Sequence, residues 1–108
     1  MAQIPASIEK ATVQLKANVY FDGGVTSHTL LLSDGTKKTV GLIRKGEYHF
    51  NTDAAERMDI IAGNCKVKLA GEKDWKAYKA GETFNVPAKS GFDIAVEAGL
   101  AEYLCSFY

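Results

Sequence analysis

Few side chains in this sequence have the chemistry to bind a metal ion or to act as a nucleophile. The chain contains two histidines, His28 and His49, and two cysteines, Cys65 and Cys105. Zinc sites usually take three or four ligands, so two histidines are too few unless Cys, Asp or Glu completes the set. Each cysteine falls in an alternating pattern of apolar and polar residues, which predicts a buried, unreactive thiol.

The charge of the chain is balanced. Its 108 residues include 13 Lys+Arg and 13 Asp+Glu, and the formal net charge is +0. Binding to nucleic acid or to an acidic membrane surface needs a field of one sign, so we expect neither partner. The N-terminus has no signal-like apolar segment, and the longest aliphatic run, residues 30–32, is too short to span a membrane. We therefore predict a cytoplasmic protein whose thiols are reduced.

Short strands are the elements predicted to position the reactive side chains. Glycine-containing turn signals recur at Asp22-Gly23-Gly24, Ser33-Asp34-Gly35, Lys45-Gly46, Gly63-Asn64, Ala70-Gly71, Ala80-Gly81, Ser90-Gly91 and Ala98-Gly99. Most of these signals are about 8–12 residues apart, which is the spacing of strands in a sandwich or barrel. Apolar and polar residues alternate between the turns, as in 64–69 and 92–97, which predicts one buried face per strand.

The predicted fold class is therefore all-β. We expect one domain of roughly eight to eleven strands, closed as a barrel or folded as two sheets, because either form removes exposed sheet edges. Residues 1–17 are predicted to form an N-terminal arm, in which Val13, Leu15 and Ala17 alternate as in a strand. Residues 18–108 form the predicted domain.

One group of residues has the spacing of the first cupin motif. His49-x-Asn51, four residues, Glu56, six residues and Gly63 resembles the cupin pattern of His-x-His, three or four residues, Glu, six residues and Gly. The second cupin motif is only half retained, because Phe92 stands where cupins have a histidine. The resemblance implies a cupin-like β-barrel of the double-sheet jelly-roll type. Asn51 is a poor ligand for a transition metal and Phe92 is none, so we expect no metal and no cofactor.

A second resemblance is closer and extends from about Val19 to the C-terminus. It rests on the segments 40–50, 56–63 and 74–87, the last ending in Phe84-Asn85-Val86-Pro87, and on Tyr103-Leu104-Cys105. These segments resemble the small cupin-like pyrimidine/purine nucleoside phosphorylase family. The resemblance implies a metal-independent enzyme of low substrate selectivity that cleaves nucleosides with orthophosphate to a free base and a pentose 1-phosphate. It also implies a homodimer.

Such a reaction develops positive charge on the pentose as phosphate attacks C1′, much as in glycoside cleavage. The predicted catalytic residues are Glu47, His49 and Glu56. A carboxylate near C1′ stabilises the cation, and a histidine can protonate the leaving base. The cupin pattern implies that Glu47 and His49 point into the barrel together with Asn51.

The reaction also needs donors for phosphate, acceptors for the pentose hydroxyls and an aromatic face for the base. The predicted substrate-binding residues are Lys37, Arg44, Tyr48, Phe50, Asn51, Asn85, Ser90, Phe92 and Tyr103, with Lys38 and Lys89 as further phosphate candidates. Phe92 is expected to face inward, whereas Tyr48 and Phe50 lie on the face opposite His49 and are weaker candidates. Each residue also has a structural explanation: a solvated charge, an ion pair, a turn or plain core.

Two other functions remain open from the sequence. A non-catalytic cupin that binds a small sugar or nucleotide would explain the loss of metal ligands. A metal-dependent enzyme would need His49, Glu56 and either His28 or a cysteine as its ligands.

Overall fold

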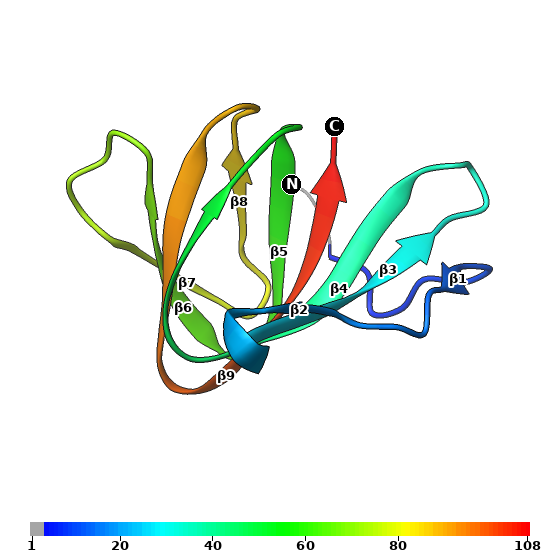
Figure 1. The fold of residues 1–108 in the computed structure, drawn as a ribbon, viewed down its shortest axis with the longest axis horizontal. Coiled ribbons are helices and arrows are strands. Elements are labelled where there is room, and N and C mark those ends of the chain that lie inside the picture. Colours follow the sequence, from blue (N-terminus) through cyan, green and yellow to red (C-terminus); the bar gives the residue numbers. More distant parts are fainter. Residues whose placement is uncertain (1–3) are drawn as a thin grey trace.

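The computed structural model describes residues 4–108, and antiparallel strands make up almost all of it (Figure 1). The elements are β1 (Thr12–Val13), β2 (Asn18–Tyr20), a 3-10 turn η1 (Phe21–Gly23), β3 (Val25–Leu31), β4 (Lys37–Asn51), β5 (Glu56–Ala62), β6 (Asn64–Leu69), β7 (Lys76–Lys79), β8 (Thr83–Val86) and β9 (Gly91–Phe107). The all-β prediction is confirmed. Residues 1–3 of the predicted arm lie outside the described residues.

The strands form one 9-stranded sheet in the order β1-β3-β4-β9-β5-β8, with β2 on β3, β6 on β9 and β7 on β6. Across residues 4–108 these pairings do not return on themselves, so the sheet is not closed as a barrel. This corrects the closed form of the prediction. The same stretch contains no helix with the length and apolar character needed to cross a membrane.

The two longest strands, β4 and β9, run side by side and bend together. Arg44 lies opposite Leu100, but Gly46 lies opposite Val96, so the register shifts at this point. Turns were predicted at Lys45-Gly46 and at Ala98-Gly99, and both predictions are wrong. Both glycine-containing dipeptides instead lie within continuous strands, Lys45-Gly46 in β4 and Ala98-Gly99 in β9, where the two strands bend. A strand that must bend needs glycine just as a turn does.

The irregularity at Gly46 exchanges the two faces of β4. Gly46 has a φ of 147°, and a Cβ there would lie 2.6 Å from the hydroxyl oxygen of Tyr48. Before the bend, the buried Ile43 faces the core. After it, Tyr48 and Phe50 pack against the core, whereas His49 is exposed. Where the register shifts, β9 has three residues where β4 has one, and an irregular pairing of this kind lets the inward-facing positions of a strand change.

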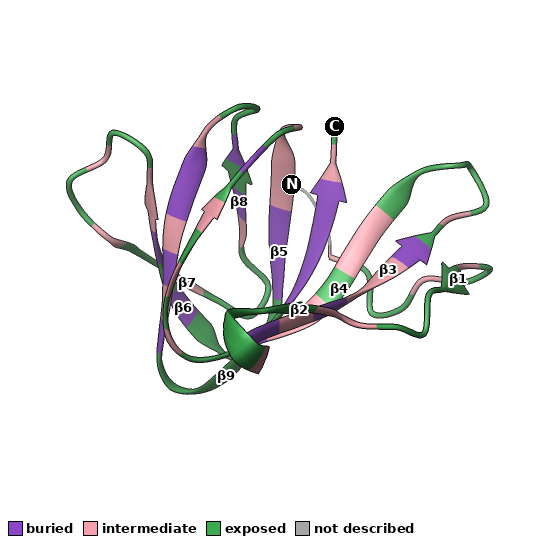
Figure 2. Cartoon of the chain, in the orientation of Figure 1, coloured by how far each residue is buried: buried purple, intermediate pink, exposed green. Residues whose placement is uncertain are grey.

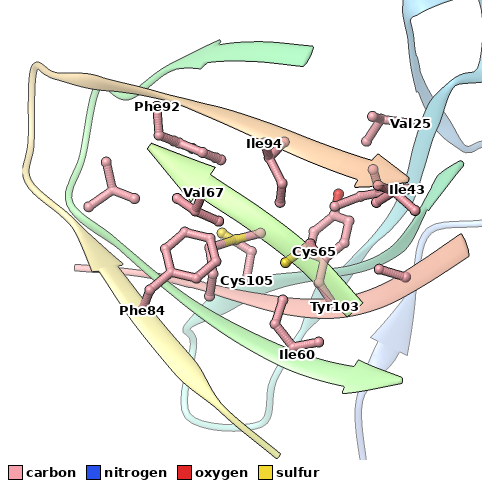
Figure 3. Close-up of a cluster of buried hydrophobic side chains, with 14 residues drawn as sticks. Val25, Ile43, Ile60, Cys65, Val67, Phe84, Phe92, Ile94, Tyr103 and Cys105 are labelled. Atoms are coloured by element: carbon pink, nitrogen blue, oxygen red, sulfur yellow. The ribbon is translucent and has the colours of Figure 1, made fainter. Parts of the chain in front are cut away.

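The core lies on the inner face of the bent sheet, and Figure 2 shows that its buried residues run along β5, β6, β8 and β9. Phe92, Ile94 and Val96 are buried, as their alternation predicted, and so are the free thiols of Cys65 and Cys105. Figure 3 shows Phe92, Ile94, Cys65 and Cys105 within this cluster of buried side chains. Burial raises the pKa of Cys65 to about 11, in keeping with the predicted unreactive thiol.

The N-terminal arm is less regular than predicted. Within residues 4–17, only Thr12 and Val13 form a strand, and they pair with Leu31 and Leu30 of β3. Leu15 is 88% exposed, so the predicted strand over Val13, Leu15 and Ala17 is wrong. A side chain pattern alone does not form a strand when no partner strand lies beside it.

Candidate functional site

A cavity of about 200 Å³ opens on the inner face of the sheet. Strands β2, β3, β4, β5 and β9 contribute its walls. The lining residues are Tyr20, Val25, Ser27, Thr39, Ile43, Phe50, Asn51, Glu56, Met58, Phe92, Ile94, Tyr103, Cys105 and Phe107. The cavity is therefore mostly apolar with a few polar groups, which is the composition of small-molecule sites.

Aromatic rings form one wall of this cavity. Phe50 of β4 and Phe92 of β9 face each other in register, and their rings stack with centroids 5.8 Å apart and an interplanar angle of 25°. Tyr20 meets Phe50 edge to face at 5.6 Å. The prediction that Phe92 faces inward is confirmed, and Phe50 faces inward with it. This wall presents aromatic surface to any ligand in the cavity.

Hydroxyl groups line a second wall. The amide nitrogen of Asn18 donates to Ser27 Oγ at 3.2 Å and to Thr29 Oγ1 at 3.1 Å. Ser27 is buried on β3, and Thr39 lies on the neighbouring β4. Burial raises the pKa of Tyr103 to about 12, so its phenol stays protonated and can donate. These neutral groups give the cavity donors and acceptors without adding charge.

A single carboxylate, that of Glu56, enters the lining of the cavity. Glu56 begins β5 and lies opposite Phe107 of β9 and Val86 of β8. The Cys105 thiol donates to Glu56 Oε1 at 3.5 Å. Desolvation raises the pKa of Glu56, and the thiol hydrogen bond opposes this shift. A half-buried carboxylate in an apolar cavity interacts strongly with positive charge, because the local dielectric constant is low.

A cation lies against Phe107, one of the lining residues, and we call this position the rim of the cavity. Lys37, the first residue of β4, places its Nζ 4.9 Å from the centre of the Phe107 ring. Phe107 itself lines the cavity and lies opposite Glu56. The predicted residues Lys37 and Glu56 are therefore both neighbours of Phe107, Lys37 through its ammonium over the ring and Glu56 as the pairing partner on β5.

The side chain of His49 points away from this cavity, contrary to expectation. It lies on the outer face of β4 with a side-chain exposure of 57%. Its Nδ1 donates to Asp93 Oδ1 at 2.7 Å, and its Nε2 lies 2.9 Å from Asn51 Oδ1. Glu47 is likewise exposed. The expected inward orientation of Glu47 and His49 is wrong, because the bulge at Gly46 exchanges the faces of the strand.

Asn51 is the member of this outer-face group that reaches the cavity. It is the last residue of β4. Both Asn51 and its neighbour Phe50 line the cavity, whereas neighbouring residues in a regular strand point to opposite faces. Alternation between the faces ends where the strand ends, so neighbouring residues can border the same space.

Five predicted binding residues do not line the cavity: Lys37, described above, and Arg44, Tyr48, Asn85 and Ser90. Arg44 Nε donates to the carbonyl oxygen of Gly23 at 3.1 Å. The Tyr48 hydroxyl donates to the carbonyl oxygens of Arg44 at 3.1 Å and Lys45 at 3.0 Å, which holds the bend. Asn85 is exposed. The carbonyl oxygen of Ser90 accepts from the backbone N–H of Thr52, and the Ser90 N–H donates to Thr52 Oγ1. Lys38 donates to Ser106 Oγ, and the exposed Lys89 donates from its backbone to Asp53.

Sequence reasoning missed several lining residues, namely Tyr20, Ser27, Thr39, Cys105 and Phe107. Ser27 and Thr39 carried a usable signal. Each is a polar residue on the same face of its strand as a buried aliphatic residue, Val25 and Ile43 respectively. A buried polar side chain must find a partner or a ligand, so such positions point to a site.

The inner wall is a poor place for a metal ion. Phe50 and Phe92 have no lone pairs to donate, and Phe92 stands where the second cupin motif has a histidine. Among residues 4–108 no three His, Cys, Asp or Glu side chains gather closely enough to hold a metal ion.

Comparisons with known proteins agree with this picture. A sequence model of a family described as pyrimidine/purine nucleoside phosphorylase matches residues 15–107. A protein of that name from Methylobacillus flagellatus is 53% identical over 102 residues, which cover 94% of this chain and 98% of the relative. The crystal structure of a protein of unknown function from Acinetobacter sp. ADP1 is similar, with a TM-score of 0.93, 40% identity, and coverage of 96% of this chain and 100% of that one.

More distant structures are similar in fold alone. A cupin superfamily protein from Desulfitobacterium hafniense matches with a TM-score of 0.63 at 14% identity, over 86% of this chain and 83% of that chain. The cupin-like character of the fold is thereby confirmed.

Proposed function

Since the chain belongs to the pyrimidine/purine nucleoside phosphorylase family, we propose that it cleaves purine and pyrimidine nucleosides with orthophosphate in the cavity of the inner sheet face. In this reaction the bond from C1′ to the base nitrogen breaks and a bond from C1′ to a phosphate oxygen forms. The electron pair of the broken bond passes to the base nitrogen, which gains one proton while phosphate loses one. The products are a free base and a pentose 1-phosphate.

The observation that carries this proposal is the pairing of an aromatic wall with a single half-buried carboxylate. The base would stack on Phe50 and Phe92. Glu56, as a carboxylate, would lie near C1′ and stabilise the positive charge that develops there. The hydroxyls of Tyr103 and Thr39 would bind the pentose, and the amide of Asn51 at the mouth of the cavity would donate to the entering phosphate.

Phosphate would approach from the rim, where Lys37 lies against the ring of Phe107. A lysine ammonium binds phosphate as a point charge, and the neutral donors beside it complete the site. The predicted roles of Glu47, His49, Arg44 and Ser90 in direct contact with substrate are not part of this proposal, because these side chains do not line the cavity.

Low selectivity between bases follows from the same wall. Stacking is available to every base, because every base has an aromatic face. A site without polar groups for the distinguishing edge of the base discriminates weakly. We propose that no metal takes part, since the lining offers an aromatic pair where ligands would be needed.

The experiment is a base-release assay on the purified protein with uridine and with adenosine, each with and without orthophosphate. We expect free base and pentose 1-phosphate only when phosphate is present. Glu56→Gln should lower kcat at least tenfold, and the exposed matched control Glu9→Gln should leave it unchanged. Base release that is independent of phosphate, or no release from any nucleoside, would refute the proposal. Thermal stabilisation by nucleoside without turnover would instead favour a binding protein.

We also propose that the protein is a homodimer that pairs through the outer face of the sheet. Val40 and Ile61 are exposed there at 37% and 39%, and both border an apolar groove of about 230 Å³ beside the N-terminal arm. Leu30 and Leu104 form the floor of that groove. Exposed aliphatic side chains around one groove favour burial against a second copy.

Sedimentation velocity tests this pairing. The parent protein should sediment as a dimer and Ile61→Lys as a monomer, while the exposed loop variant Lys73→Glu stays dimeric. A parent protein that is monomeric at micromolar concentration would contradict the proposal. Location in the cytoplasm, where free thiols such as Cys65 and Cys105 stay reduced, and the double-sheet jelly-roll form of the fold remain predictions.

A further inference from the structure

Three side chains on adjacent strands connect the outer face of the sheet to the mouth of the cavity. Asp93 of β9 lies opposite His49 of β4, and His49 is followed two residues later by Asn51. His49 Nδ1 is 2.7 Å from Asp93 Oδ1, and His49 Nε2 is 2.9 Å from Asn51 Oδ1. Asn51 alone of the three lines the cavity. His49 thus does not line the cavity itself, but it forms a hydrogen bond with Asn51, which does.

The protonation of His49 determines how this chain of contacts can be satisfied. Both of its partners in the structure are oxygen acceptors, so both ring nitrogens must carry a proton. The imidazolium form meets this requirement. Neutral imidazole has one donor and one acceptor, and Asp93 accepts from the donor. The remaining lone pair on Nε2 then faces an amide oxygen, which is unfavourable.

We propose that His49 is a positioning residue that decides which end of the Asn51 amide faces the cavity. As imidazolium, His49 holds Oδ1 of Asn51 and leaves the Nδ2 group to donate to an anionic or hydroxyl ligand at the mouth. As neutral imidazole, it accepts from Nδ2, so the amide turns and presents its oxygen to the cavity. This inference rests on the proposed function only for the identity of the ligand.

The charges around His49 favour the imidazolium. The hydrogen bonds to Asp93 and then to Asn51 raise the pKa of His49, and desolvation opposes them. The exposed carboxylate of Glu47 lies two residues earlier on the same face of β4. Lys68 of β6 lies opposite Asp93, and its positive charge would disfavour the imidazolium of His49. Its Nζ, however, lies over the Trp75 ring, 5.2 Å from the ring centre. The donor state of Asn51 is therefore the one that persists toward neutral pH.

The sign of the pH effect follows directly. As pH rises through the pKa of His49, the mouth of the cavity loses a donor and gains an acceptor. The KM for orthophosphate should then rise about fivefold, which is the value of one hydrogen bond, while kcat changes little. Asp93→Asn removes the main cause of the raised pKa and should move this transition to lower pH. His49→Gln cannot titrate and should abolish the transition.

An NMR titration tests the switch without relying on turnover. The chain has two histidines, and His28, whose Nδ1 contacts the carbonyl oxygen of Gln14 at 3.1 Å, is the internal control. The side-chain amide signals of Asn51 should shift with the His49 midpoint and not with that of His28. In Asp93→Asn, both the His49 and Asn51 midpoints should fall together.

The outcomes separate this inference from the proposed function. Asn51 amide signals that stay constant through the His49 titration would overturn the switch, whether or not the protein is active. A titrating Asn51 in a protein that releases no base would leave the switch standing and remove the phosphorylase proposal. A KM for phosphate that is independent of pH in the active parent protein, or equally dependent in His49→Gln, would also overturn the switch.

Discussion

Replacement of Phe50 by leucine separates stacking from simple burial in the cavity. Phe50 contacts three aromatic rings, those of Tyr20 at 5.6 Å, Phe21 at 5.5 Å and Phe92 at 5.8 Å. Leucine keeps an apolar side chain at the site but has no aromatic face. Because Phe50 is only half-buried and the apolar character is kept, Phe50→Leu should lower the free energy of unfolding by about 1–2 kcal/mol.

The effect on substrate should be larger than the effect on the fold. Stacking of a base on an aromatic side chain contributes about 1–3 kcal/mol. A ligand that stacks on the wall of Phe50 and Phe92 should therefore lose about 5- to 150-fold in affinity in Phe50→Leu. The KM should rise for uridine and for adenosine alike, whereas the KM for phosphate should stay the same.

Steady-state kinetics with each nucleoside, alongside urea unfolding, make the comparison. Tyr78→Leu is a matched control, because Tyr78 is a partly buried aromatic residue that packs against the core and does not line the cavity. If Phe50→Leu is folded and its nucleoside KM stays within twofold of the parent value, the base does not stack there. The assignment of the aromatic wall as the base subsite would then be wrong.

Three further substitutions test the structure from other sides. Gly46→Ala should lower the free energy of unfolding by about 1–3 kcal/mol in urea melts, because a side chain at a φ of 147° is strained and its Cβ would meet Tyr48; an unchanged midpoint would contradict the bend. The pKa of Glu56 is raised in the folded state, so folding is penalised as pH rises above the ordinary carboxyl value of 4.5. Glu56→Gln should therefore be more stable than the parent at pH 7 but not at pH 4, as measured by chemical denaturation at the two pH values. A variant that is less stable than the parent at pH 7 would contradict this reasoning. Ile94→Ala, at a fully buried position, should cost about 2–5 kcal/mol in the same assay, and a cost below 1 kcal/mol would mean that this part of the core is loosely packed.

The strands that lie in the middle of the sheet were predictable from the sequence, because their side chains alternate against a shared core. The pattern Phe92, Ile94, Val96 is buried as expected. The arm was not predictable in the same way, since Val13 and Leu15 alternate without a surface to bury them. Period-2 patterns report a strand only where a core lies on one side.

The candidate site was predictable by residue type more than by orientation. Phe92 and Glu56 were identified from the motif positions and Lys37 as a cation that phosphate would need, and the structure brings all three to the cavity or its rim. The orientations of His49 and Phe50 were assigned the wrong way round. The signal for a bulge is a single glycine, Gly46, and the sequence does not distinguish it from a turn.

The bend in β4 makes the length of the chain as decisive as its composition. Between the pairs Arg44–Leu100 and Gly46–Val96, β9 has three residues where β4 has one, and the inward-facing positions change across this point, so the orientation of residues 48–51 depends on the exact number of residues here. A deletion at that point would return Glu47 and His49 to the interior and expel Phe50, without altering any of those side chains. In this architecture the loss of one residue from β4 would replace an aromatic cavity wall by one with histidine and carboxylate side chains. Insertions and deletions within a strand, and not only point substitutions, can therefore change the chemistry of the cavity.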